Sequence, residues 1–240
     1  MIPIYQFADL SPDQILNRDI QAEADVGAAV DEILTGVREG GDEALRSYTR
    51  RFDGAEIPDL EVSPQEIEAA WSTLDPDFRS TLELAAENIR HFHSQQVHRD
   101  FVVADRPGIV MGQRYTPIQR VGVCVPRSPE AFPSTILMNV IPARIAGVSE
   151  IYVVTPPRPD GSVSAEALAA AYIAGATRVF RVGGAQAVAA LAYGTETIPQ
   201  VDKIVGPGGI FVAAAKRKVF GRGAIDMIAG PSEIPVLSDG

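Results

Sequence analysis

The sequence predicts an α/β fold in which a doubly wound, mostly parallel sheet follows a helical region. Three observations lead to this prediction. From about residue 120, short strands alternate with helices, which is the order of a parallel sheet with right-handed crossovers. Each expected strand is apolar throughout, as in a sheet covered on both faces. Residues 1–100 instead show the apolar spacing of amphipathic helices, so the chain changes character along its length.

The first hundred residues predict helices whose ends are marked by capping residues. An apolar face of helical spacing runs through residues 26–37, and Gly40-Gly41 is expected to end that helix. Asp42 then stands where an N-cap of the next helix would stand. Further along, Ser63-Pro64-Gln65-Glu66 has the pattern of a capping box with proline at the first helical position. Asp75-Pro76 opens a longer helix in the same way.

A β-hairpin is expected to connect the two regions. Apolar residues flank the turn Asp105-Arg106-Pro107-Gly108, which contains both Pro and Gly. The predicted domain organisation is therefore a helical N-terminal region (1–100), a hairpin connection (101–119) and a Rossmann-like α/β domain (120–240).

Within the α/β domain, each expected strand is short and is followed by a helix or a glycine-rich turn. The expected strands are Gly122–Val125, Ile151–Thr155, Val179–Val182, Lys203–Val205 and Ile225–Met227. The expected helices lie near 133–147, 164–175, 185–193 and 209–219. Two glycine turns, Gly183-Gly184 and Gly206-Pro207-Gly208-Gly209, come directly after strands. Ligands of open α/β sheets bind at the carboxyl ends of strands, so these turns predict a binding crevice.

Composition excludes several classes of partner. The 240 residues carry a formal net charge of −10, which argues against a nucleic-acid or anionic-membrane partner. Acidic residues concentrate in residues 1–100, whereas residues 101–240 have a slight excess of basic ones, which favours the latter as host of an anionic ligand. A single cysteine excludes an internal disulfide and fits a reducing cytoplasm. The N-terminus lacks a signal-peptide pattern, and no run approaches the ~18 apolar residues of a membrane span.

Four polar or glycine-rich features near strand ends are candidate ligand contacts. Gln186, in the first turn after Gly183-Gly184, either faces the crevice or caps its helix. The turn Gly206-Pro207-Gly208-Gly209 either contacts a ligand or is only a tight connection, and neither a G-x-G-x-x-G nor a Walker A pattern is present. Arg127 could bind a phosphate or carboxylate or be solvated. Ser232 could bind a ligand or cap its turn.

Histidine and cysteine offer weaker candidates. The three histidines, His91, His93 and His98, lack the His-x-x-x-His spacing of a zinc-binding helix face, so we expect them to be structural or solvated. Cys124 ends the first strand of the sheet, where a nucleophile could sit. A buried thiol is the commoner outcome at such a position.

Taken together, motifs along nearly the whole chain resemble the histidinol dehydrogenase family. The matching segments include Arg38-Glu39-Gly40-Gly41-Asp42-Glu43-Ala44-Leu45, Pro117-Ile118-Gln119-Arg120-Val121-Gly122, Phe132-Pro133-Ser134-Thr135-Ile136-Leu137-Met138, Ile141-Pro142-Ala143-Arg144-Ile145-Ala146-Gly147, the stretch Val182–Glu196, Val201-Asp202-Lys203-Ile204-Val205-Gly206-Pro207-Gly208 and Ile225-Asp226-Met227-Ile228-Ala229-Gly230-Pro231-Ser232-Glu233.

The resemblance implies a cytoplasmic, zinc-dependent homodimer that oxidises L-histidinol to L-histidine through the aldehyde with NAD, in histidine biosynthesis. It implies that Gln186 contacts NAD and that Ser232 contacts histidinol. Two positions depart from the family: Cys124 replaces its NAD-contacting tyrosine, and Gly209 replaces the asparagine of its Gly-Pro-Gly-Asn turn. Arg127-Ser128 also stands where the family has Gly-Gly.

The family's glutamate–histidine acid/base pair and its zinc ligands lie beyond the last match, so no catalytic or metal-binding residue is assigned in this chain. We therefore expect the 240-residue chain alone not to oxidise histidinol. Two alternatives remain: a non-catalytic member that serves as a binding or dimerisation module, and a dehydrogenase of another small alcohol.

Overall fold

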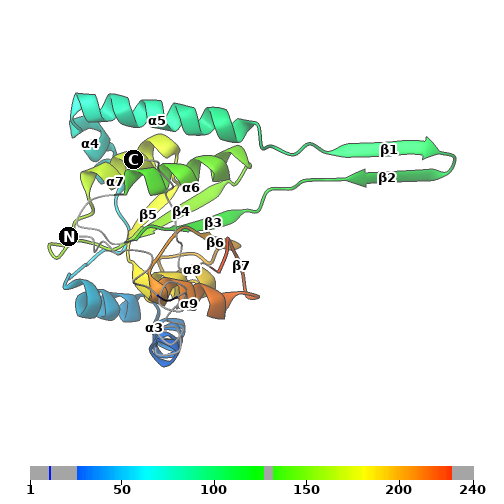
Figure 1. Cartoon of the computed structure of the whole chain (residues 1–240). Helices are drawn as coiled ribbons and strands as arrows, with labels where there is room; N and C mark the ends of the chain where they lie inside the picture. Colours follow the sequence, from blue (N-terminus) through cyan, green and yellow to red (C-terminus); the bar gives the residue numbers. More distant parts are fainter. Residues whose placement is uncertain (1–10, 12–25, 127–131, 229–240) are drawn as a thin grey trace.

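The computed structural model describes Ser11, residues 26–126 and residues 132–228. Figure 1 shows a central sheet with helices on both faces and a long two-stranded arm. Of the residues singled out above, Arg127, Ser128 and Ser232 lie outside the described ranges.

Five parallel strands form the sheet in the order β5-β4-β3-β6-β7. Their bounds are Arg120–Cys124 for β3, Glu150–Thr155 for β4, Arg178–Arg181 for β5, Lys203–Val205 for β6 and Ala224–Ile225 for β7. Val123 on β3 lies in register with Val153 on one side and Val205 on the other. The predicted fold class, a doubly wound parallel sheet, is confirmed, and each strand overlaps its predicted range.

The direction of winding reverses between β3 and β6. Helices α6 (Pro133–Ile145) and α7 (Ala165–Ala174) cover one face of the sheet, while α8 (Gly184–Tyr193) and α9 (Ile210–Val219) cover the other (Figure 1). The chain moves outward from β3 to β5 on the first face and returns to β6 on the second. This reversal creates a crevice at the carboxyl ends of β3 and β6.

The helical N-terminal region contributes to both outer layers. Helix α3 (Gly27–Asp53) packs on α8 and α9, whereas α4 (Pro64–Thr73) packs on α7 and α5 (Pro76–Ser94) packs on α6. Each face of the sheet is therefore covered twice. Alternate strand residues divide between two apolar clusters: Val123 belongs to the cluster beneath α6 and α7, and Cys124 to the cluster beneath α8.

The helix starts agree with the capping patterns at two positions. The Ser63 hydroxyl accepts a hydrogen bond from the Glu66 N–H at 3.2 Å, with Pro64 at the first helical position of α4. The Asp75 carboxylate accepts from the N–H groups of Asp77 and Phe78 at the start of α5.

Asp42 does not act as the predicted N-cap. Gly41 interrupts α3 with φ 51° and ψ −135°, as the glycine pair predicts. The Asp42 carboxylate nevertheless accepts from the backbone N–H of Thr197, at 3.2 Å, and from its hydroxyl. The Asp42 N–H donates to the Glu196 carboxylate at 2.8 Å. The prediction was wrong because the hydrogen-bond partners of Asp42 lie in a loop about 154 residues later in the chain and not in the first turn of its own helix.

The predicted hairpin is confirmed as an arm that projects from the body (Figure 1). Strands β1 (Phe101–Arg106) and β2 (Ile109–Gln113) pair antiparallel, and every residue in both strands is exposed. Across the described ranges, no helix combines the length and apolarity needed to cross a bilayer.

Candidate functional site

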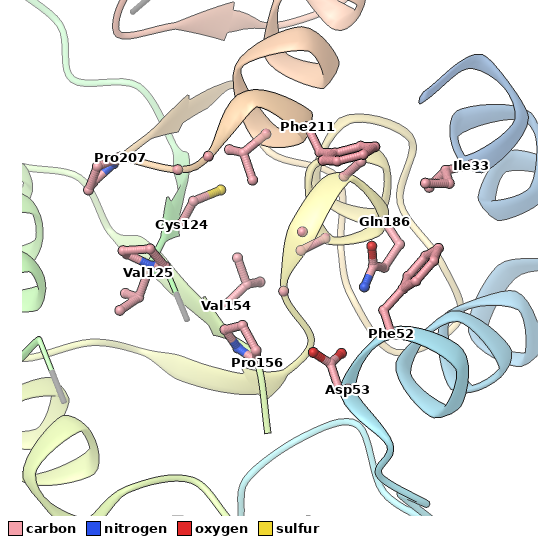
Figure 2. Close-up of a pocket in the computed structure, with 18 residues that line it drawn as sticks. Ile33, Phe52, Asp53, Cys124, Val125, Val154, Pro156, Gln186, Pro207 and Phe211 are labelled. Carbon is pink, nitrogen blue, oxygen red and sulfur yellow. The ribbon is translucent and has the colours of Figure 1, made fainter. Parts of the chain in front are cut away.

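A cavity of about 440 Å³ lies where the winding reverses. It is bounded by the carboxyl ends of β3 and β4, the turns that open α8 and α9, and the end of α3 (Figure 2). Its lining residues are Ile33, Phe52, Asp53, Cys124, Val125, Pro126, Val154, Pro156, Gly183, Gly184, Ala185, Gln186, Ala187, Pro207, Gly208, Gly209, Phe211 and Val212. The structure thus brings together both glycine turns that the sequence singled out.

The glycines at this cavity are required by close backbone approach. Gly206 has φ +102°, and a Cβ added there would lie 2.3 Å from the Cys124 carbonyl oxygen. A Cβ on Gly183 would lie 2.1 Å from Cγ of Pro156. Glycine therefore lets β6 turn directly over the end of β3, and lets α8 begin against the end of β4. The N-termini of α8 and α9 both border the cavity, which favours a ligand with negative charge.

Gln186 is the amide that opens onto this space. Its side chain lies in the first turn of α8 and is 2% exposed. It does not form the alternative capping contact: among the described residues, no hydrogen-bond partner of this amide is present. Figure 2 shows it beside the Phe52 ring and above Asp53, on the side of the cavity formed by α3. An amide that faces the cavity can both donate a hydrogen bond to a bound ligand and accept one from it.

Cys124 lines the opposite wall as a buried thiol. It is 4% exposed, and burial raises its pKa to about 12, with the nearby Lys216 and Asp226 acting in opposite directions. The thiol is therefore protonated near neutral pH. Of the two roles left open by the sequence, the structure favours a wall of the cavity over a nucleophile.

Gly209 leaves open space at the start of α9. It is the N-cap residue, with φ −69° and ψ −177°, a conformation that any residue adopts. A Cβ added there would meet nothing within 4 Å. The turn therefore has room for the amide side chain that the family resemblance implies at this position.

An ion pair between a buried lysine and a partly exposed aspartate, which sequence reasoning missed, supports the second glycine turn. Lys216 on α9 is 5% exposed, and its ammonium donates to the Gly206 carbonyl at 3.0 Å and to the Asp226 carboxylate. Asp226 in turn accepts from the Gly206 N–H at 2.8 Å. Both peptide groups that flank Gly206 are thus fixed by hydrogen bonds to this ion pair. The signal available in the sequence was a lysine placed on the inner face of a short helix.

Phe52 and Asp53 were also missed. They are the last two residues of α3. The next residue of the chain that lines the cavity is Cys124, at the end of β3 and more than 70 residues later. An acidic residue at the end of an amphipathic helix, followed by Gly54, predicts solvent exposure. The structure instead buries Asp53 to 7% exposure.

The histidines lie apart from this cavity. His91 and His98 are exposed, and His93 is half-buried with its Nδ1 2.6 Å from Oε1 of Gln96. Within residues 26–126 and 132–228, no group of three or more His, Cys, Asp or Glu side chains could hold a metal ion.

Comparison with known proteins identifies the family. Residues 16–240 match the family model described as histidinol dehydrogenase. The chain belongs to the histidinol dehydrogenase family. It is 51% identical over 211 residues to a histidinol dehydrogenase of Geobacillus kaustophilus, covering 88% of this chain and 50% of that protein. It is 46% identical over 241 residues to that of Chlorobaculum tepidum, covering 100% of this chain and 56% of that protein.

A solved structure gives the same result. The crystal structure of a histidinol dehydrogenase from Elizabethkingia anophelis matches with a TM-score of 0.83 and 33% sequence identity, covering 90% of this chain and 53% of that one. The chain spans about half the length of the curated relatives that it matches.

Proposed function

We propose that this chain carries the NAD-binding part of a histidinol dehydrogenase, which oxidises L-histidinol to L-histidine through the aldehyde in histidine biosynthesis. The observation that carries the proposal is Gln186, an amide that is 2% exposed, opens onto the cavity and has no partner among the described residues. Family membership and the position of the cavity at the reversal of winding support the same assignment.

The residues around the cavity fit a dinucleotide. Its walls are mostly apolar, and the N-termini of α8 and α9 offer backbone N–H groups to an anionic pyrophosphate. NAD, when bound, accepts the hydride that leaves the carbon being oxidised. Gln186 would hold and orient the cofactor through its amide, while Val125 and Val154 exclude water from the bound molecule.

The described residues contain no cluster of His, Cys, Asp or Glu side chains that could bind zinc. We propose that the 240-residue chain alone does not oxidise histidinol. Ser232, the proposed histidinol contact, lies outside the described residues. We further propose the cytoplasm as the compartment, supported by the single cysteine, and a homodimer as the assembly, which the family resemblance implies.

Calorimetric titration of NAD into the purified chain tests the proposal. We expect saturable binding, and we expect Gln186→Met to weaken it by about tenfold. Methionine keeps the volume of the side chain and removes the unpartnered amide, so the melting temperature should not fall. Gln200→Met is the matched control, because Gln200 is exposed and is not among the residues that line the cavity. Absence of NAD binding by the unmodified chain would overturn the proposal.

A non-catalytic family member is the second candidate, and the departures at Cys124 and Gly209 favour it. Neither a tyrosine ring nor an asparagine amide is present where the family resemblance implies them. An activity assay with histidinol, NAD and zinc tests the inactivity that both candidates predict for this chain. We expect no NADH; zinc-dependent NADH production would contradict the expected inactivity of the isolated chain and this second candidate together.

A further inference from the structure

The turn that follows β6 has a backbone that its own residues do not fix. Gly206 has φ +102°, and the turn passes so close to β3 that a Cβ there would lie 2.3 Å from the Cys124 carbonyl oxygen. The next three residues, Pro207, Gly208 and Gly209, all line the cavity. Because a turn built largely from glycine has little conformational preference of its own, contacts from other segments must set its position.

Lys216 on α9 and Asp226, directly after β7, supply those contacts. The Lys216 ammonium donates to the Gly206 carbonyl at 3.0 Å and to the Asp226 carboxylate. That carboxylate also accepts from the Gly206 N–H at 2.8 Å and from the Met227 N–H at 2.7 Å. The Asp226 N–H in turn donates to the Ile204 carbonyl of β6 at 3.1 Å. The pair therefore ties the turn to α9 and to the end of β7 together.

The pair acts on the cavity without entering it. Neither Lys216 nor Asp226 is among the residues that line the cavity. The Lys216 side chain is 6% exposed and that of Asp226 is 29% exposed. Lys216 lies in the last turn of α9, and helical side chains lean toward the N-terminus of their helix, so its ammonium is carried back beneath the turn. Any effect of the pair on a ligand must therefore pass through the turn.

Stability alone explains a buried lysine poorly at this place. Taking an ammonium out of water costs free energy, and replacing a buried ion pair by apolar residues of similar volume is often neutral or stabilising. A methionine would fill the same space in α9 without that cost. An apolar side chain could not, however, donate to the Gly206 carbonyl. The arrangement of charges is thus matched to the two peptide groups of the turn.

We propose that Lys216 and Asp226 are positioning residues that set the turn at 206–209 for the ligand bound in the cavity. This inference rests on the NAD-binding function proposed above. The pair holds the N–H groups at the start of α9 in place before the ligand arrives, so binding does not have to order them. Without the pair the cavity keeps the same lining residues, but the turn moves and the affinity for the ligand falls.

Three variants separate a positioning role from a structural one. Lys216→Met removes the ammonium at similar volume, Asp226→Asn leaves that ammonium without a charged partner, and the double variant removes both charges. We expect Asp226→Asn to melt lower by about 5 °C or more and the double variant to melt within about 3 °C of the unmodified chain. We expect all three to bind NAD about tenfold more weakly in calorimetric titration. A purely structural pair predicts instead that NAD affinity recovers with the melting temperature in the double variant.

Hydrogen exchange of the ligand-free chain gives a readout that needs no cofactor. We expect the amides of residues 206–213 to exchange about threefold faster or more in the double variant, while the amides of residues 183–188, at the start of α8, keep their rates. Lys218→Met is the matched control, because Lys218 lies on the same helix but pairs with Asp31 of α3 at 2.8 Å. It should leave the NAD dissociation constant and the exchange at 206–213 unchanged.

The outcomes keep this inference apart from the proposed function. If the unmodified chain binds NAD and the double variant binds it equally well, the positioning role is wrong and NAD binding stands. The same holds if exchange at 206–213 is unchanged in the double variant, or if Lys218→Met weakens NAD as much as Lys216→Met does. If the unmodified chain does not bind NAD, the proposed function and this inference are both overturned.

Discussion

Replacing Gly209 with asparagine should restore a missing part of the cofactor site and stabilise the fold at the same time. Gly209 is the N-cap of α9 and borders the cavity. Its backbone, at φ −69° and ψ −177°, suits any residue, and a Cβ there meets nothing within 4 Å. An asparagine side chain can therefore cap the helix or reach into the cavity without displacing a neighbour.

The expected gain in the free energy of unfolding is the sum of two small contributions. Asparagine is a better N-cap than glycine by a few tenths of a kcal/mol, so capping contributes about 0.3 kcal/mol. Removing glycine freedom from the unfolded chain, at a position whose native backbone is unstrained, adds about 0.4–1 kcal/mol. A total near ~1 kcal/mol corresponds to a rise in melting temperature of about 2–4 °C for a chain of this size. One neutral hydrogen bond to NAD would tighten binding by about two- to tenfold.

Differential scanning calorimetry and NAD titration measure the two effects separately. Gly209→Asp is the matched control, because aspartate caps a helix as well as asparagine but places a negative charge beside the N-terminus of α9. We expect both variants to melt higher than the unmodified chain and only the asparagine variant to bind NAD more tightly.

Two results would refute this reasoning at different points. A lower melting temperature for Gly209→Asn would show that the space at the start of α9 is not open. A higher melting temperature with unchanged NAD affinity would show that a side chain at this position does not reach the cofactor.

Three further predictions concern residues near the cavity and the α3 kink. Gly206→Ala should lower the free energy of unfolding in urea by at least about 2 kcal/mol, because φ is +102° and the new Cβ meets the Cys124 carbonyl; an unchanged midpoint would contradict this. At pH 8, iodoacetamide should label Cys124 far more slowly in the folded chain than in urea, because burial raises its pKa to about 12. Burial alone would raise the pKa of Asp42, but hydrogen bonds from Thr195 and Thr197 lower it overall. The stability that Asp42 adds over Asp42→Asn should therefore be present above about pH 4 and be lost as the pH falls through the lowered pKa, and a difference that grew on acidification would disprove the assignment.

The strands and helices around the site could be predicted from local sequence patterns. Lys203–Val205 coincides with β6, and the Ser63 capping box forms as its residues predict. Periodicity and capping depend on neighbours a few residues apart, so sequence alone resolves them. Gln186 was identified for the same reason, since a polar side chain beside Gly183-Gly184 marks the start of a helix at a sheet edge.

The partners of Asp42 and the burial of Asp53 at the cavity could not be predicted in this way. Asp42 meets Thr197 across 155 residues, and Asp53 reaches the cavity only because α3 packs against α8. Lys216 is buried because it meets Asp226 and the Gly206 turn together. From sequence alone, each of these charged side chains is expected to be exposed to solvent. Their burial is decided by which segments of the chain pack together in the fold.

By itself, the sequence determined the parallel sheet, its two glycine turns and the Gln186 amide, because short-range spacing encodes strands, helices and turns. Only the tertiary structure decided that one cavity joins those turns to the end of α3, placing a carboxylate opposite two helix N-termini. The physical reason is that a parallel sheet brings the carboxyl ends of its strands to one edge, whatever their separation along the chain. The wall contributed by α3 instead depends on the packing of α3 against α8 and α9, which come much later in the sequence.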